Sequence, residues 1–328
     1  MIATVPAGIR MTRRRWLTLG VLAVCALLAA EGIGRVAGLH HPVLYEVTGY
    51  GYRVKPGQDI RRFGNRYFSN AFGLRSESTT SLPGPGVLRI LCLGDSLTNG
   101  GAVTDQAETY PYFLNQQLGT AKRSVEVLNA SAPGWAIANE LGWLQANGTF
   151  GASVVILTMG GADLYQPAAS SEIVGHHPSF PSDARWLALH ELGARYLLPR
   201  LFPQSLADPG TGQPAGNSSV LDHVVEHVLA VARYARSHDA TPVILYVERP
   251  GQVDLSNLHM QHAKSLLFAA LARENISVLS TREAVEQAGG TALFRDGLHP
   301  NAEGNRVLAL TAAKLLERIL GDLPAVSP

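Results

Sequence analysis

Three side chains that together can activate a hydroxyl group stand at two distant places in this sequence. Ser96 lies between glycines in residues 94–100 (GDSLTNG), directly after the apolar run 87–93. A serine on a tight turn at the end of a buried strand exposes its hydroxyl, which suits a nucleophile. Far downstream, Asp296 and His299 supply a carboxylate and an imidazole that can orient and deprotonate such a serine. The pattern predicts nucleophilic chemistry with Ser96, Asp296 and His299 as its catalytic residues.

The strands and helices that must bring these residues together are predicted to form an α/β domain. Short apolar runs predict buried strands at 87–93, 125–128, 154–159 and 243–247. Helices are predicted at 108–118, 136–144, 220–236 and 301–320. Buried strands that alternate with helices favour a parallel sheet covered on both faces, a three-layer flavodoxin-like arrangement. Ser96, Gly134 and Gly160 each follow a strand end, so we expect them to converge at one rim of the sheet.

The N-terminal region carries a second strong signal. Arginines cluster in residues 1–15, and an almost uncharged run extends from Trp16 to Ala30 and resumes weakly up to residue 39. A basic flank before an apolar stretch is held on the cytoplasmic side of a membrane. We therefore predict a transmembrane anchor or signal segment at 16–39, with an uncleaved anchor favoured over a cleaved signal. Either interpretation places the rest of the chain outside the cytoplasm, in the cell membrane or secreted.

Composition and length limit the remaining possibilities. The chain has 328 residues, 46% hydrophobic and 16% charged, with a formal net charge of +1. No basic surplus indicates a nucleic-acid partner. We divide the chain into a linker with short strands at 40–86 and a main domain at 87–322. An insertion at about 164–219 is rich in proline, glycine and serine, and its one expected helix, 182–198, fits a lid or a surface excursion.

Four sequence blocks in order resemble the SGNH, or GDSL, hydrolase superfamily, especially its membrane-anchored bacterial members. The blocks are Gly94-Asp95-Ser96, residues 129–134 (NASAPG), residues 160–163 (GGAD) and residues 296–299 (DGLH). The similarity covers roughly residues 65 to 320 and includes the segment 70–75 (NAFGLR). The ordered set is specific, although each block alone is weak.

The resemblance implies a serine esterase that works through an acyl-enzyme. In it, the N–H groups of Ser96 and Gly134 would stabilise the oxyanion, and Asp95 and Asp163 would support their turns by hydrogen bonds. One position departs from the family pattern: Ala162 stands where the family has an asparagine that donates a third hydrogen bond. Losing such a donor costs about 10²–10³ in rate. We therefore expect slow catalysis or a substitute donor, which we favour over a domain that no longer catalyses.

Other functions remain open at this stage. Residues 223–227 (HVVEH) match a zinc-peptidase pattern, but their helix reads as an ordinary amphipathic one, and we expect no metal and no cofactor. The favoured substrate is an ester: an acylated glycan, a lipid or a small molecule. The alternatives are an O-acyltransferase with the same three residues and an envelope-binding module with a decayed site. The sequence leaves the oligomeric state undetermined.

Overall fold

The computed structural model describes residues 12–119, 124–202, 218–248 and 258–321. Its centre is a five-stranded sheet in the order β6-β5-β7-β8-β9, in which every neighbouring pair is parallel. The strands are β5 (Val87–Gly94), β6 (Ser124–Ser131), β7 (Val154–Gly160), β8 (Thr241–Val247) and β9 (Ser277–Ser280). This is the flavodoxin-like strand order, with its switch point between β5 and β7. The predicted fold class is confirmed.

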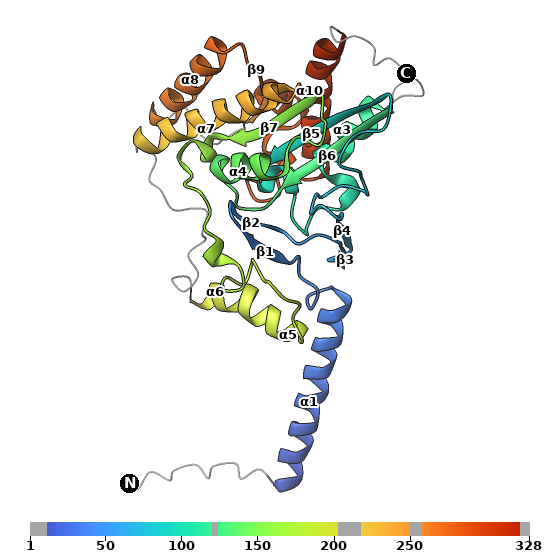
Figure 1. The fold of residues 1–328 in the computed structure, drawn as a ribbon. Coiled ribbons are helices and arrows are strands. Elements are labelled where there is room, and N and C mark those ends of the chain that lie inside the picture. The colour runs from blue at the N-terminus through green and yellow to red at the C-terminus, as the bar shows by residue number, and fades with distance from the viewer. Residues whose placement is uncertain (1–11, 120–123, 203–217, 249–257, 322–328) are drawn as a thin grey trace, which may run out of the picture.

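Alternate side chains of the strands point to opposite faces of the sheet and build a separate core on each face. Leu91 and Leu93 of β5 join the core on one face, whereas Ile90 and Cys92 of the same strand join the other. Helices α4 (Ile137–Asn147), α7 (Ser218–Ser237) and α8 (Leu258–Arg273) cover the first face. Helices α3 (Tyr110–Leu118) and α10 (Ala302–Gly321) cover the second. Figure 1 shows the resulting three layers.

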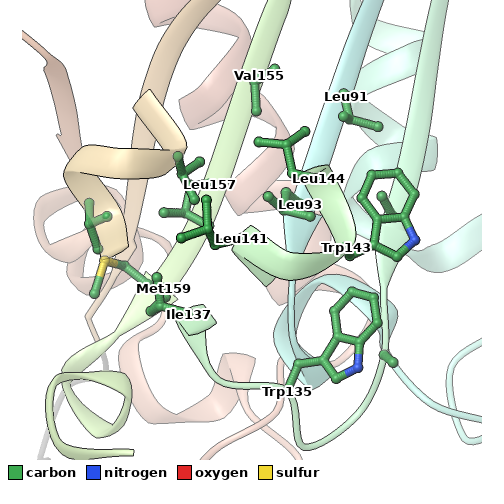
Figure 2. Packing of buried hydrophobic residues seen from close by; sticks show 14 of the residues in the cluster. Leu91, Leu93, Trp135, Ile137, Leu141, Trp143, Leu144, Val155, Leu157 and Met159 are labelled. Atoms are coloured by element: carbon green, nitrogen blue, oxygen red, sulfur yellow. The ribbon is translucent and has the colours of Figure 1, made fainter. Parts of the chain in front are cut away.

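The core beneath α4 is dense and apolar. Figure 2 shows Leu141 and Leu144 of this helix above Leu93, Leu157 and Met159 of strands β5 and β7. All of these side chains are buried, and so are the indoles of the neighbouring tryptophans, Trp135 and Trp143. Packing of this kind fixes the strand ends that carry the candidate site.

The remaining elements are short. They are α2 (Ser96–Asn99), α9 (Arg282–Ala288) and 3-10 turns at Gln106–Glu108, Gly161–Tyr165, Ser171–Ile173 and Gly290–Leu293. Strand β9 and helices α8 and α9 lie in a region where the sequence analysis assigned no element. β9 has only four residues, two of them serines, and three of the four are half-buried, so its sequence carries no apolar run like those from which the other strands were predicted.

Residues 40–86 contain two antiparallel hairpins that pack against the sheet domain. They pair β1 (Tyr45–Thr48) with β2 (Gly51–Val54), and β3 (Gln58–Arg62) with β4 (Asn65–Ser69). Tyr52 and Tyr67 are fully buried and belong to the same core cluster as Leu93 and Leu157. The hairpins therefore share their apolar core with the sheet.

Two helical segments lie on the side of the hairpins away from the sheet. Helix α1 (Arg13–Val36) is almost wholly exposed, and its length and composition suffice to cross a membrane. The other segment runs from α5 (Ala188–Glu191) through a π-helical turn (Leu192–Leu197) to α6 (Leu198–Leu201). We call residues 188–201 the cross helix. The helix predicted at 182–198 begins too early, because residues 183–187 pass in extended and bend conformations before Ala188.

One acidic side chain, that of Glu140 on α4, is buried in the core, and its Oε2 atom lacks a hydrogen-bond partner among the described residues. Burial raises the pKa of Glu140 well above its ordinary value, and the nearby carboxylates Asp163 and Asp95 raise it further. The folded protein therefore holds this carboxyl group neutral at pH values where the unfolded chain ionises it.

The raised pKa of Glu140 predicts how stability depends on pH. Above the unfolded pKa of about 4.5, the folded state binds one more proton than the unfolded state, so the free energy of unfolding falls with rising pH. Glu140→Gln removes this proton linkage. Relative to the parent, the variant should gain up to about 1.4 kcal/mol per pH unit until the native pKa is reached. Urea unfolding between pH 4 and 8 measures the difference, with the exposed Glu317→Gln as control; parallel curves for parent and Glu140→Gln would contradict it.

Candidate active site

Ser96 stands at the first position of α2, immediately after strand β5. Asp95 caps this short helix: its Oδ1 accepts a hydrogen bond from the Leu97 N–H at 2.8 Å, and its Oδ2 lies 3.3 Å from Ser96 Oγ. Gly94 is required by the tight turn, because a Cβ there would lie 2.2 Å from Thr98 Oγ1. Burial raises the pKa of Asp95, against the opposing effect of the Leu97 N–H and His299. The turn thus presents the Ser96 hydroxyl at the rim of the sheet.

His299 connects Ser96 to Asp296. Its Nε2 lies 3.0 Å from Ser96 Oγ, and its Nδ1 lies 2.8 Å from Asp296 Oδ2. Partial burial favours the neutral form of Asp296, but hydrogen bonds from the backbone and ring of His299 outweigh it and lower the pKa to about 2. The carboxylate is therefore ionised at neutral pH. A negative carboxylate at Nδ1 favours the tautomer in which Nε2 is free to accept the serine proton.

The loop that carries this pair is held in place by its own backbone. The Arg295 N–H donates to the His299 carbonyl at 2.9 Å, and the Asn301 N–H donates to the Leu293 carbonyl at 2.8 Å. The N–H groups of Leu298 and His299 both donate to Asp296 Oδ1, at 3.0 and 2.8 Å. The loop then passes directly into α10, which is packed against the sheet. The imidazole is thereby fixed relative to β5.

Gly134 lies beyond the end of β6, facing the same space. Its φ is +79°, a left-handed conformation that favours glycine. A Cβ at this position would lie 2.9 Å from the Tyr52 hydroxyl and 3.4 Å from the Phe180 ring. The Tyr52 hydroxyl donates to the Pro133 carbonyl at 2.7 Å. Hairpin β1–β2 and the insertion together hold this turn, and the sequence analysis identified neither contribution.

The fourth predicted component lies at the end of β7. Asp163 is buried and its Oδ2 accepts a hydrogen bond from the Gly160 N–H at 2.7 Å, which closes the turn. Ala162 is exposed and lines the pocket with a methyl group. The structure therefore brings all four sequence blocks to one rim, and it places no side-chain amide at position 162.

A pocket of about 310 Å³ opens in front of these residues. Ser96, Gly134 and His299 line one part of it, and Leu97, Phe180, Val247 and Leu298 give it an apolar wall. Gln166 also lines it; its Nε2 donates to the carbonyls of Gly134 and Trp135, both at 3.2 Å. Gln166 and Phe180 come from the insertion, and no spacing in the sequence marked them.

Arg75 ties the segment before the sheet domain to the nucleophile turn. Its guanidinium is buried and donates to the carbonyls of Asn99, Gly101 and Thr104, the last two at 2.7 Å. Asn129 adds a second tie, since its Nδ2 donates to the Thr98 carbonyl at 2.9 Å. These bonds hold the end of α2, and with it the position of Ser96.

The zinc-peptidase pattern at 223–227 lies on α7, an amphipathic helix whose Val224 and Val228 are buried in the core. Within the described ranges, no group of three His, Cys, Asp or Glu side chains is placed to hold a metal ion. Glu248, at the end of β8, is bound by Lys264 and Arg282, with its Oε1 2.6 Å from Lys264 Nζ and 2.9 Å from Arg282 Nη2. The apolar residues of 223–227 thus pack in the core, and Glu248 serves in a cluster of ion pairs.

Comparison with known families gives this geometry a context. A sequence model of the GDSL-like lipase/acylhydrolase family matches residues 92–307, more than half of the chain. The chain belongs to this family. Family members are generally serine esterases, and the match spans Ser96 and the Asp296–His299 loop. No curated protein matches the chain in a sequence comparison.

Several solved structures of the GDSL group are similar to this chain. The esterase EstA from Pseudoalteromonas sp. is 14% identical with a TM-score of 0.45, and the match covers 71% of this chain and 99% of EstA. Axe2, an acetylxylan esterase from Geobacillus stearothermophilus, is 14% identical with a TM-score of 0.46, and the match covers 75% of this chain and 99% of Axe2. TesA is 17% identical with a TM-score of 0.46, and the match covers 70% of this chain and 99% of TesA.

The contact between Asp296 and the ring predicts the effect of Asp296→Asn. The asparagine carbonyl can still accept from the Leu298 and His299 N–H groups, but its NH₂ group cannot accept from Nδ1. Ester hydrolysis should therefore lose about 10²–10⁴ in kcat with little change in KM. Steady-state kinetics on a chromogenic ester measures it, with melting temperature as a check on folding. Unchanged kcat in a folded variant would show that Asp296 does not orient the ring.

Proposed function

We propose that this protein is a membrane-anchored serine esterase that hydrolyses acyl esters outside the cytoplasm through an acyl-enzyme. One observation carries the proposal: His299 lies within hydrogen-bond distance of both Ser96 Oγ and Asp296 Oδ2. A hydroxyl, an imidazole and a carboxylate in series are the groups that acyl transfer by serine requires. Acylated envelope glycans, lipids and small esters are the proposed substrates.

In the first half-reaction Ser96 Oγ attacks the ester carbonyl carbon while His299 Nε2 takes the hydroxyl proton. The carbonyl oxygen becomes an oxyanion, which the N–H groups of Ser96 and Gly134 stabilise. The tetrahedral species then collapses: the bond from carbon to the alcohol oxygen breaks, and the imidazolium returns its proton to that oxygen. The alcohol leaves, and the acyl group remains on Ser96.

In the second half-reaction water replaces the alcohol. His299 Nε2 removes a proton from the water as the oxygen attacks the acyl carbon. Collapse of the second tetrahedral species breaks the bond to Ser96 Oγ, and the imidazolium returns the proton to the serine. The products are a carboxylic acid and the original enzyme. Asp296 stays ionised throughout, which agrees with its pKa of about 2.

Helix α1 supports the proposed location. The helix spans Arg13–Val36 and its apolar surface is almost fully exposed. At 1.5 Å per residue its 24 residues extend about 36 Å, enough for a hydrocarbon core of about 30 Å. The arginines at 13–15 favour a cytoplasmic N-terminal end, so the domain that follows lies on the opposite side.

A fluorophosphonate probe tests the nucleophile. We expect the probe to label the purified full-length protein at Ser96 and Ser96→Ala to abolish both labelling and hydrolysis of a graded panel of esters. Ser179→Ala is the matched control: Ser179 lines the same pocket, and this variant should still be labelled at Ser96. Mass spectrometry of the labelled peptide identifies the site.

Two results would contradict the proposal. A folded protein that the probe does not label would favour a binding module without covalent chemistry. Labelling that persists in Ser96→Ala would place the nucleophile elsewhere.

Ala162 predicts a gain of function. Ala162→Asn introduces an amide next to the oxyanion position, where a single donor is worth about 10²–10³ in rate in other hydrolases. We expect kcat to rise by at least about tenfold, and by up to about 10²–10³, in steady-state assays with the best ester of the panel. Ala162→Leu is the size-matched control and should give no increase. No change or a fall in the folded Asn variant would contradict the assignment of the oxyanion position.

A further inference from the structure

The cross helix and its flanks expose large apolar side chains at both ends. Trp186 is 92% exposed and Leu201 is 69% exposed, and Leu187, Leu197 and Leu198 are exposed as well. Single exposed apolar residues are ordinary, but several of them on one short segment indicate a surface made for a partner.

The cross helix is fixed to the rest of the protein. Glu191 is buried and forms an ion pair with the buried Arg62 of β3. The Arg62 guanidinium also lies 3.2 Å from the Tyr196 hydroxyl, and the Tyr196 ring packs edge-on against Phe63. These contacts hold the cross helix against hairpin β3–β4 while its exposed apolar side chains remain uncovered.

The start of the cross helix is joined to the domain-side end of α1. Glu31 of α1 accepts hydrogen bonds from the N–H groups of Ala188 and Leu189, both at 3.0 Å. Arg35 donates to the Trp186 carbonyl at 2.6 Å, and Gly34 lies directly against Ala188. Figure 1 shows the cross helix running crosswise from this junction, between the domain and the free length of α1.

We propose that the cross helix lies in the headgroup region of the bilayer that α1 enters, with its exposed apolar side chains inserted among the lipids. This inference rests on the proposed anchoring by α1. The uncharged run of α1 ends at Ala30, and the junction begins at Glu31, so the cross helix is held at the level where hydrocarbon gives way to headgroups. Amphipathic helices bind at that level with apolar residues inward.

The chemistry of the exposed residues favours lipid as the occupant. Tryptophan is enriched at the membrane interface, because its ring is apolar and its N–H is polar, and Trp186 is the most exposed aromatic residue at the junction. Arg200 is exposed within the cross helix and can bind anionic phosphate groups. A bilayer is also the one partner whose position α1 already determines. Two attachments would limit the tilt of the domain relative to the membrane.

Spin-label accessibility in nanodiscs that contain anionic lipid tests the inference on the full chain. In a Cys25→Ala background the buried Cys92 stays unlabelled, and Leu201→Cys carries the label. We expect this label to be accessible to oxygen and shielded from a water-soluble nickel chelate. Leu310→Cys on α10, an exposed leucine on the sheet domain, is the matched control and should show the reverse. Both leucines are exposed in the protein, so neither variant should impair hydrolysis of a soluble ester.

The outcomes separate this inference from the proposed anchor. The parent chain, labelled at its native Cys25, reports on the anchor in a parallel sample. A label at 201 as accessible to nickel as the label at 310, with the Cys25 label of the parent shielded in lipid, would overturn the inference and leave the anchor intact. A water-accessible Cys25 label in the parent would instead overturn the anchor. Poor access of both reagents to position 201, together with dipolar broadening between labels, would assign the face to a second copy of the chain and would also overturn the inference.

Discussion

The site depends on the contact between the His299 imidazole and Ser96, which stand 203 positions apart in the chain. The imidazole Nε2 must stay within about 3 Å of Ser96 Oγ, although the two residues are delivered by different elements. β5 delivers the serine and the loop before α10 delivers the histidine. These elements meet because the apolar side of α10 packs, with α3, on the second face of the sheet, against Ile90 and Cys92 of β5 itself. The core on that face therefore sets the distance between the Ser96 hydroxyl and the imidazole.

The other wall of the site depends on segments outside the alternating strands and helices. Gly134 is held in its left-handed turn by Tyr52 from a hairpin and Phe180 from the insertion. Arg75, in the segment between hairpin β3–β4 and β5, fixes the end of α2. Residues 40–86 thus do more than connect an anchor to a domain: they complete the core and brace both the nucleophile and the oxyanion turn.

The central architecture could be predicted because its signals are local. β5 and β7 are predominantly apolar runs, and the glycines and polar residues that follow them mark where the strands end. The pairing of Asp296 with His299 also has a local signal, a spacing of three residues. Contacts between distant segments leave no such trace. Nothing near Arg62 predicts Glu191, and Glu140 reads as an ordinary polar position of an amphipathic helix, although its carboxyl group is buried.

The buried pair Arg62–Glu191 bears on how the sheet domain is oriented relative to α1. Removing two charges from water offsets much of their attraction, so such a pair adds little stability compared with apolar residues of similar volume. Its geometry is specific, however, because an Arg guanidinium and a carboxylate fit together in few orientations. The pair joins β3 to the cross helix, and the cross helix is capped by Glu31 of α1. A chain of directional polar contacts therefore connects α1 to hairpin β3–β4. Apolar packing alone would permit sliding at this junction, whereas these contacts define one orientation of the domain relative to α1.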